Sequence, residues 1–458
     1  MHAKLNKNQI EYIFYHLNHH FVFTNEIKNR IIIDDETTPT FPQIRFQLSC
    51  DKLDRVKYID KIPILFPIND ENAFYKFDDE NNLIFNDDLM KSAFYLLSGF
   101  QELNHPVLDK YERFSYQQSI QKKLNIAEFP LVNHYFKVIT EGIEKFCLKN
   151  NYSFSRRNIW QDKAFGFLLT HDVDRVDKYN IAQVKLKIKQ FFGLSPSKLS
   201  KFKTLKLLIT NIVRLFGSDN PFWNFDWLKS LENKYGFRSV WFFLPQGDPH
   251  KDAYFSFDEQ RIKEVVNKLI QLGDEIGLHA TYNSFNNEKV MKNDYNAVKK
   301  LLNQNPSGSR QHWLRFNYPN TLRILEKLEI KYDSTWGFHD QIGWRNSYCL
   351  PFRPYDVEQD RMMNIWEFPL TVMDTTLFEY LDLSEAEAEQ ATDKILNAVE
   401  SYGGLFVLLW HNNNFIFETG RNLTNFYIRL FERIAEKNPL SFIPNKLIEG
   451  KLKRLNEN

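Results

Sequence analysis

Ala164-Phe-Gly-Phe-Leu-Leu-Thr-His-Asp-Val-Asp174 joins a short apolar run to a polar run that ends on two carboxylates. The apolar half has the length and character of a strand that is buried on both faces of a parallel sheet. Similar runs recur along the chain, and helical periodicity separates some of them. The predicted strands are 164–169, 239–244, 275–278, 308–313, 365–368 and 405–410, and the predicted helices between them are 257–272 and 321–328.

This alternation of strand and helix predicts an α/β fold with parallel strands. About 300 residues suffice for a distorted or incomplete (β/α) barrel, which spans 200 residues or more. A doubly wound open sheet is the alternative. We therefore expect the barrel over 158–458, preceded by a smaller α/β domain of unknown role over 1–150. The polar stretch 149–157 is the expected linker.

Composition excludes several classes of protein. The 458 residues contain 59 basic and 58 acidic side chains, so a dedicated nucleic-acid binder is not expected. The three cysteines are widely spaced, which excludes a disulfide scaffold and fits a reducing compartment. We see no secretory signal or membrane-spanning run, and expect a cytoplasmic protein. In 1–150 no cluster of metal-binding or catalytic side chain types stands out, so a structural or binding domain is expected.

Polar side chains lie at or near the ends of four of the predicted strands. They are Asp172 and Asp174, then His279, then Arg310, His312 and Arg315, and finally His411. Because functional groups of parallel α/β folds gather at the carboxyl ends of strands, we expect these side chains to converge. Imidazoles and a carboxylate form a common zinc ligand set that leaves a position open for water or substrate. The pattern predicts a metal-dependent hydrolase, in which one carboxylate binds the cation and the other acts on the activated water.

Five segments in this order resemble the motifs of NodB-type polysaccharide deacetylases, carbohydrate esterase family 4. They are Thr170-His-Asp-Val-Asp174, Gly277-Leu-His279, Arg315-Phe-Asn-Tyr318, Tyr332-Asp-Ser-Thr-Trp-Gly337 and Leu408-Leu-Trp-His411. The resemblance covers roughly 160–415. Residues 1–150 resemble the uncharacterised domain that precedes some bacterial deacetylase-like proteins. The family implies a distorted barrel and metal-assisted removal of acetyl groups from N-acetylated sugars, free or as glycolipid precursors.

The resemblance also implies roles for individual residues. Asp172 becomes the general base and His411 the general acid, while Asp174 and His279 bind the metal. The remaining roles are that Arg315 or Arg310 steadies Asp172, that the backbone N–H of Tyr318 stabilises the oxyanion, and that Glu367 or Asp374 orients His411. His171 is expected to point away from the site.

One position departs from the family pattern. The second motif usually reads His-x-x-x-His, but here it is His279-Ala-Thr-Tyr-Asn283. An amide oxygen is a poorer zinc ligand than an imidazole, so either Asn283 leaves the metal weakly bound or another residue completes the set. Our hypothesis is that His312 supplies the missing ligand from the neighbouring strand; a histidine buried in the core is the alternative.

Aromatic side chains near the motifs are candidates for the substrate cleft. Trp336 is the first choice, with Trp313, Trp344, His339 and Asp340 as further candidates. Aromatic rings suit the apolar faces of sugars, but most aromatic side chains in a chain with 41 Phe are expected in the core.

A basic insertion at 179–218 contains eight Lys or Arg and no Asp or Glu. Apolar residues recur at helical spacing over 198–216. This pattern is typical of a helix that lies on an anionic membrane face, here the inner face, and equally of an insertion packed on the barrel with solvated lysines. Two other functions also stay open: a catalytically silent protein that binds glycan or a partner, which the missing histidine favours, and another C–N hydrolase on the same barrel.

Overall fold

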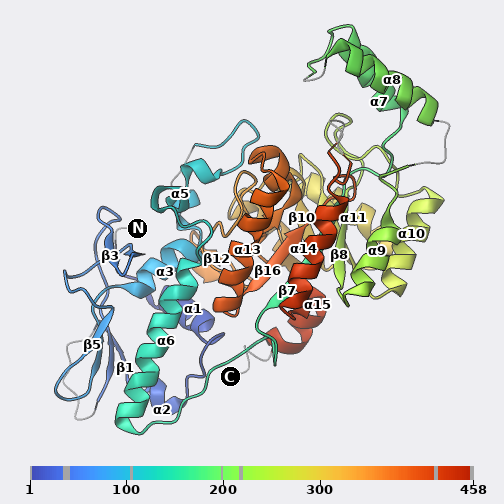
Figure 1. The fold of residues 1–458 in the computed structure, drawn as a ribbon. Helices are drawn as coiled ribbons and strands as arrows, with labels where there is room; N and C mark the ends of the chain where they lie inside the picture. The colour runs from blue at the N-terminus through green and yellow to red at the C-terminus, as the bar shows by residue number, and fades with distance from the viewer. Residues whose placement is uncertain are drawn as a thin grey trace.

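The computed structural model describes residues 3–34, 42–103, 107–197, 200–215, 220–416 and 421–453. A small N-terminal domain lies beside a larger barrel domain, and a pair of helices projects from the barrel (Figure 1). Of the predicted basic insertion, residues 198, 199 and 216–218 lie outside the described residues. In the described part of the chain, no helix has the length and apolar character needed to cross a membrane.

The N-terminal domain is a mixed α/β unit. Its sheet has the strand order β1-β2-β6-β5, with β5 antiparallel to β6 and the other pairs parallel. The smaller α/β domain expected from the sequence is therefore present. Its elements are α1 (Lys7–Leu17), α2 (Asn25–Lys28), β1 (Ile31–Ile33), β2 (Ile44–Phe46), β3 (Lys57–Ile59), β4 (Ile62–Ile64), β5 (Tyr75–Phe77), β6 (Leu83–Phe85), α3 (Leu89–Leu97), α4 (Phe100–Leu103), α5 (Ile120–Leu124) and α6 (Leu131–Asn150).

The large domain is built on a parallel sheet with the strand order β14-β11-β10-β9-β8-β7-β16-β15, and β17 also pairs with β7. Its strands are β7 (Gly166–Val173), β8 (Ser239–Phe243), β9 (Glu275–Ala280), β10 (Gly308–Gln311), β11 (Tyr332–Asp333), β14 (Trp366–Glu367), β15 (Val372–Met373), β16 (Leu405–Leu409) and β17 (Leu440–Ser441). No pairing among the described residues joins β14 to β15. The sheet is thus an incomplete (β/α) barrel, and its sequential strand order lacks the reversal of a doubly wound sheet.

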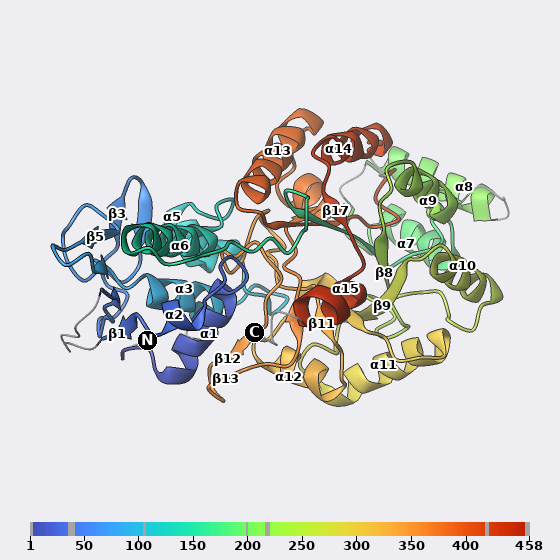
Figure 2. The same ribbon diagram turned by 90° about the horizontal axis from the view of Figure 1, so that it is seen from below.

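Helices cover the outside of the sheet (Figure 2). They are α9 (Phe225–Lys234), α10 (Gln260–Gln271), α11 (Glu288–Leu302), α12 (Asn320–Lys327), α13 (Glu385–Ser401), α14 (Thr424–Glu436) and α15 (Pro444–Leu447). The pair that projects from the barrel consists of α7 (Ile181–Phe191) and α8 (Lys201–Leu215), and a hairpin of β12 (Tyr355–Asp356) and β13 (Arg361–Met362) lies near α1. All eight residues of β7 are buried, as expected for a strand with both faces covered.

The strand β7 is longer than the sequence predicted and runs to Val173 instead of ending at 169. The polar residues fit inside a buried strand because their side chains have partners. Thr170 Oγ1 donates to the Leu408 carbonyl, and His171 contacts the Trp410 carbonyl through Nδ1 and Glu232 through Nε2. Since side chains alternate along a strand, His171 lies on the face opposite to Asp172, as predicted.

The two domains share one hydrophobic core. Buried apolar side chains of the N-terminal domain, such as Tyr12 and Phe94, belong to the same cluster as Tyr348, Phe352 and Trp366 of the barrel domain. The N-terminal domain therefore packs on the barrel through apolar side chains.

Candidate metal centre and active site

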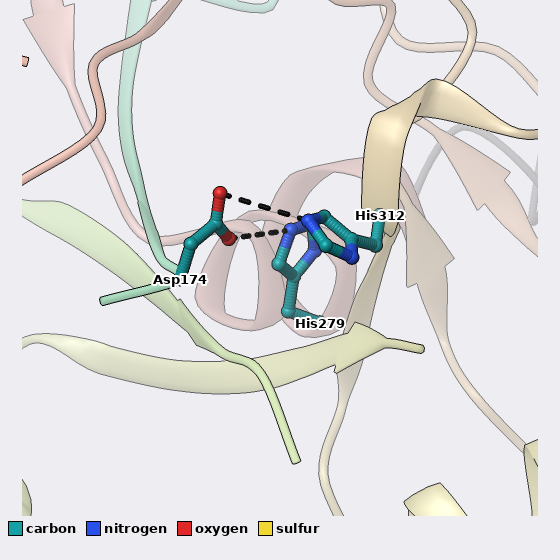
Figure 3. Close-up of side chains that lie close together, drawn as sticks. All are labelled: Asp174, His279 and His312. Atoms are coloured by element: carbon teal, nitrogen blue, oxygen red, sulfur yellow. Dashed lines mark ion pairs between the residues drawn. The ribbon is translucent and has the colours of Figure 1, made fainter. Parts of the chain in front are cut away.

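Three side chains converge at the carboxyl ends of β7, β9 and β10 (Figure 3). Asp174 Oδ1 lies 3.2 Å from His279 Nε2, and Asp174 Oδ2 lies 3.7 Å from His312 Nε2. One ligand atom of each residue lies within 4.8 Å of the others. The cluster thus contains the residues that the sequence predicted as metal ligands, including His312 in place of the second-motif histidine.

Both imidazoles are held by a partner on their other nitrogen. His279 Nδ1 lies 2.9 Å from the Arg310 carbonyl oxygen, and His312 Nδ1 lies 2.9 Å from Asp252 Oδ1. Asp252 is itself fixed by the backbone N–H groups of Tyr282 and Asp248. A partner on Nδ1 leaves Nε2 free to bind a cation, which is the usual arrangement around a metal-bound histidine.

The charges of the cluster, and its ligand atoms that lack a hydrogen-bond partner among the described residues, suit a divalent cation. His279 Nε2, Asp174 Oδ1 and Asp172 Oδ1 are buried and have no hydrogen-bond partner among the described residues. Burial opposes ionisation of Asp174, but His312 and His279 outweigh it and hold the pKa of that carboxyl well below its usual range. Burial lowers the pKa of His312, yet Asp174 and Asp252 raise it to about 9. Without a cation, the acidic cluster thus holds a proton on His312 that a bound cation would displace.

Asp172 and His411 flank this cluster. Asp172 Oδ2 lies 3.5 Å from His279 Nε2, and His411 Nε2 lies 3.8 Å from Asp174 Oδ2. Asp374 holds His411 twice, because it accepts from the backbone N–H at 2.9 Å and contacts Nδ1 at 2.7 Å. Burial lowers the pKa of His411, but Asp374 outweighs this and raises it to about 10.

Of the two candidate partners of His411, Asp374 is therefore the one in contact. Glu367 instead accepts a hydrogen bond from the backbone N–H of Trp336. Burial and the neighbouring Asp333 raise the pKa of Glu367 well above its usual range.

Neither predicted arginine pairs with Asp172 in the described part of the chain. Arg310 lies inside the barrel, where it donates to the hydroxyls of Thr170 and Ser334. Arg315 donates to the Tyr111 carbonyl and pairs with Glu112, both from the N-terminal domain. The expectation that Arg315 or Arg310 steadies Asp172 is thus wrong, because both guanidinium groups are directed to other partners.

Tyr318 also lies away from the cluster. Its ring packs 4.9 Å from that of Trp336, its hydroxyl donates to the Tyr355 carbonyl, and it does not line the cavity around Asp174. The turn His312–Leu314, which follows β10, lines this cavity. The oxyanion role expected of Tyr318 therefore does not fit its position.

The side chains predicted to line the substrate cleft fall into two groups, those that line the cavity and those that do not. Trp313 and His339 line the cavity, whereas Trp336 and Trp344 are fully buried in the core. Asp340 accepts a hydrogen bond from the backbone N–H of Tyr116 and is absent from the cavity lining. Asn283, the alternative metal ligand, is exposed and also absent from it.

The cavity at the cluster measures about 280 Å³. Besides the predicted residues, several side chains line it that the sequence did not suggest: Tyr111, Arg113, Gln311, Leu314, Met373, Thr375, Glu379 and Tyr380. Tyr111 and Arg113 come from the N-terminal domain, for which the sequence predicted a structural or binding role without naming any residue. No motif marks them, because they reach the site through tertiary packing alone.

A known family model matches only the N-terminal part of the chain. Residues 1–147 match DUF7033, a family of unknown function. No curated protein matches the sequence. A structure from Mycobacterium smegmatis, assigned as a polysaccharide deacetylase, has 16% identity and a TM-score of 0.42, and the match covers 64% of this chain and 93% of that one.

Two further solved structures are similar at the same level. A polysaccharide deacetylase from Pseudomonas aeruginosa PAO1 has 13% identity and a TM-score of 0.41, with 66% of this chain and 95% of that chain covered. Puue allantoinase has 14% identity and a TM-score of 0.41, with 64% and 93% covered.

Proposed function

We propose that this chain is a metal-dependent hydrolase that removes an N-acetyl group from a saccharide or saccharide-lipid. The carrying observation is the arrangement of Asp174, His279 and His312 between a carboxylate, Asp172, and an imidazole, His411. Two imidazoles and a carboxylate favour zinc among the common divalent metals. When bound, the cation supplies electrophilic activation of the amide carbonyl and of the attacking water.

The flanking residues divide the proton transfers between them. Asp172, whose Oδ1 has no hydrogen-bond partner, takes a proton from the attacking water. His411 is protonated at neutral pH because Asp374 raises its pKa to about 10, and it gives its Nε2 proton to the leaving nitrogen. The backbone of the turn His312–Leu314, instead of Tyr318, faces the oxyanion. Water and the acetamido group thereby become acetate and a free amine.

The test is acetate release from N-acetylated saccharides by the metal-loaded chain. Asp172→Asn should lower the rate by about 10²- to 10⁴-fold, the usual contribution of a general base, without loss of bound metal. Asp258→Asn is the matched control, since Asp258 is exposed and pairs with Lys300 away from the site. Bound metal without acetate release over a broad panel would favour a silent binding protein, and release from another C–N substrate would favour a different hydrolase.

We further propose peripheral contact of the chain with an anionic membrane face. The helices α7 and α8 pack on each other as a hairpin that projects from the barrel (Figure 1), and the supporting observation is that large apolar side chains of this hairpin are exposed. The exposed side chains are Ile181, Ile188, Phe192, Phe202, Leu205, Ile209, Ile212 and Val213, each 36 to 78% exposed. In contrast, polar side chains are buried in the hairpin: Lys187, Thr204 and Asn211.

This packing is the reverse of that expected for a helix pair in water, where apolar side chains lie inside. Exposed apolar side chains among several lysines, with no acidic residue in 179–218, complement a surface of anionic lipids. The contact therefore involves both helices, and not only the predicted segment 198–216. Co-sedimentation with vesicles of anionic and of neutral lipid tests this membrane contact.

A further inference from the structure

The N-terminal domain sends one segment into the active site of the barrel. We call residues 107–116 the strap. The strap is shaped by Asp109, whose carboxylate accepts hydrogen bonds from the backbone N–H groups of Tyr111 and Arg113, each at 2.9 Å. The same carboxylate accepts from Arg113 Nε and Nη2, at 2.9 and 2.7 Å. These contacts form a tight turn that carries the Arg113 and Tyr111 side chains toward the cavity.

Two arginines clamp the strap to the barrel in opposite directions. Arg113, from the strap, is 3% exposed and donates through Nη1 to the Trp313 carbonyl at 3.1 Å and to the Tyr380 hydroxyl at 3.2 Å. Arg315, from the barrel, is also 3% exposed and donates through Nε to the Tyr111 carbonyl at 2.9 Å. Buried, charged hydrogen bonds of this kind fix geometry firmly, so the strap is a permanent wall of the cavity.

The wall is aromatic. The Tyr111 ring stands edge-on to the Trp313 ring, with centroids 4.7 Å apart. His339 and Tyr380 lie on the cavity lining as a second ring pair, with centroids 5.2 Å apart. Trp313 follows His312 directly, so this aromatic part of the cavity begins one residue from the metal cluster. A group that reacts at the cluster must therefore belong to a molecule whose next few atoms meet these rings.

The charges on this side of the cavity are balanced. Arg113 is the cation of the wall, and Asp109 neutralises it at hydrogen-bond distance. Burial and the neighbouring Arg113 lower the pKa of His339 to about 3, so its ring is neutral. Lys110, also in the strap, has its Nζ 4.9 Å from the Tyr111 ring centroid but does not line the cavity. Among the described residues that line this side of the cavity, the Arg113 guanidinium is paired with Asp109, so no free cation is left there to hold a carboxylate or phosphate group of a ligand.

From this arrangement we infer that the strap builds a binding subsite for a neutral sugar ring, with Tyr111 as a specificity-determining residue supplied by the N-terminal domain. Aromatic faces bind the apolar faces of sugar rings by dispersion and exclusion of water, and they need no charge to do so. The inference rests on the proposed function for the identity of the reacting group. It assigns to the DUF7033-type domain the selection of the saccharide.

The experiment compares binding and turnover for two saccharides. The probes are a neutral N-acetylglucosamine disaccharide and an analogue of it in which a uronic acid replaces one sugar. Calorimetry with the zinc-loaded full chain should give the neutral disaccharide at least about tenfold tighter binding than the acidic one. Tyr111→Ala should weaken binding of the neutral disaccharide about tenfold and raise KM to the same extent, with kcat changed less than about twofold, because the ring packs against the sugar and takes no part in the proton transfers.

Tyr58→Ala is the matched control, because Tyr58 lies in the same domain, is 52% exposed and does not line the cavity. Tyr111→Phe keeps the ring and should retain the wild-type Kd, which separates stacking from a folding defect. Equal Kd values for wild type and Tyr111→Ala, or tighter binding of the acidic saccharide, would overturn the subsite even if acetate is released. A Kd weakened by Tyr111→Ala in a chain that releases no acetate would instead support the subsite and contradict the proposed hydrolysis.

Discussion

The barrel carries two additions, the strap and the hairpin of α7 and α8. They differ in whether their side chains find partners within the chain. In the strap of the N-terminal domain, the side chain that faces the barrel, Arg113, is buried and donates to the Trp313 carbonyl, and the Tyr111 carbonyl accepts from Arg315. The hairpin of α7 and α8 buries polar side chains and exposes apolar ones. A segment held to the barrel by buried, charged hydrogen bonds is part of the cavity wall, whereas two helices that expose most of their large apolar side chains indicate a partner outside the chain.

The largest expected effect is on the hairpin. Ile209→Asp together with Val213→Asp places two charges on the outward face of α8, where the native side chains are 55 and 67% exposed. Binding to vesicles that contain anionic lipid should fall at least about 100-fold. Each change removes CH₂ groups that the membrane would bury and adds a negative charge that the anionic lipid repels. Co-sedimentation measures this effect, and acetate release from a soluble saccharide should stay within about twofold of wild type.

Ile270→Asp is the control for the hairpin, since Ile270 is 38% exposed on α10, outside the basic insertion. Wild-type binding that is equal on anionic and neutral vesicles, or absent on both, would contradict the membrane contact and leave the hairpin as a solvated insertion.

The next effect concerns the support of the metal centre. Asp252→Asn removes the carboxylate that contacts His312 Nδ1. We expect zinc affinity to fall about 10- to 100-fold, which is the usual loss when the partner of a metal-binding histidine is changed. Competition with a chromophoric chelator gives the affinity. Asp258→Asn, which changes an exposed carboxylate outside the cavity lining, should retain the affinity. An unchanged zinc affinity in Asp252→Asn would exclude a supporting role of Asp252.

A smaller effect is expected at the clamp of the strap. Arg315→Lys keeps the charge but loses the forked donors that reach the Tyr111 carbonyl and Glu112. The free energy of opening the strap should fall by about 1.4 kcal/mol, the scale of one or two hydrogen bonds from a charged group. Hydrogen exchange over 107–116 should then be about tenfold faster, with exchange in α7 and α8 unchanged. Equal acceleration in both elements would indicate general destabilisation instead of a local clamp.

The smallest effect is a pH dependence of the domain interface. His19 is buried against Trp366 of the barrel, with ring centroids 6.1 Å apart, and burial, followed by His20, lowers its pKa to about 3. The unfolded chain binds a proton near pH 6.5 and the folded chain does not, so the stability contribution is complete above 6.5 and is lost as the pH falls toward 3. Between pH 7 and 5.5 the free energy of unfolding should fall by about 1.2 kcal/mol for this one group. Denaturant titration of wild type and His19→Gln measures the difference, and an identical pH dependence in both would exclude His19.

Much of the barrel and of the metal cluster was predictable because local patterns carry them. Apolar runs give the buried strands, and the residue types after Leu169, Leu278 and Leu409 identify the site. The sequence also offered His312 as one hypothesis, because the second motif has Asn283 in place of a histidine, and the structure places His312 in the cluster. The sequence correctly excluded His171 from the site by the alternation of side chains.

The errors share a physical cause, which is that long-range packing decides where a guanidinium group or a ring points. Arg315 follows a site motif, but its partners are about 200 residues earlier in the chain, on the strap. Trp336 was the favoured cleft aromatic, yet it fills the core beside Gly99 of the N-terminal domain. Tyr111 and Arg113 were missed for the same reason, because the barrel and the N-terminal domain share one core and no local pattern reports it.

The most direct test of the account is acetate release from N-acetylated saccharides by the zinc-loaded chain, by the chain treated with a chelator, and by the treated chain after zinc is restored. We expect the wild-type chain to stop releasing acetate when the chelator removes the metal and to resume when zinc is restored. His312→Ala should not resume acetate release when zinc is restored. Release that persists after the metal is removed, or that returns fully in His312→Ala, would contradict a metal centre built from Asp174, His279 and His312.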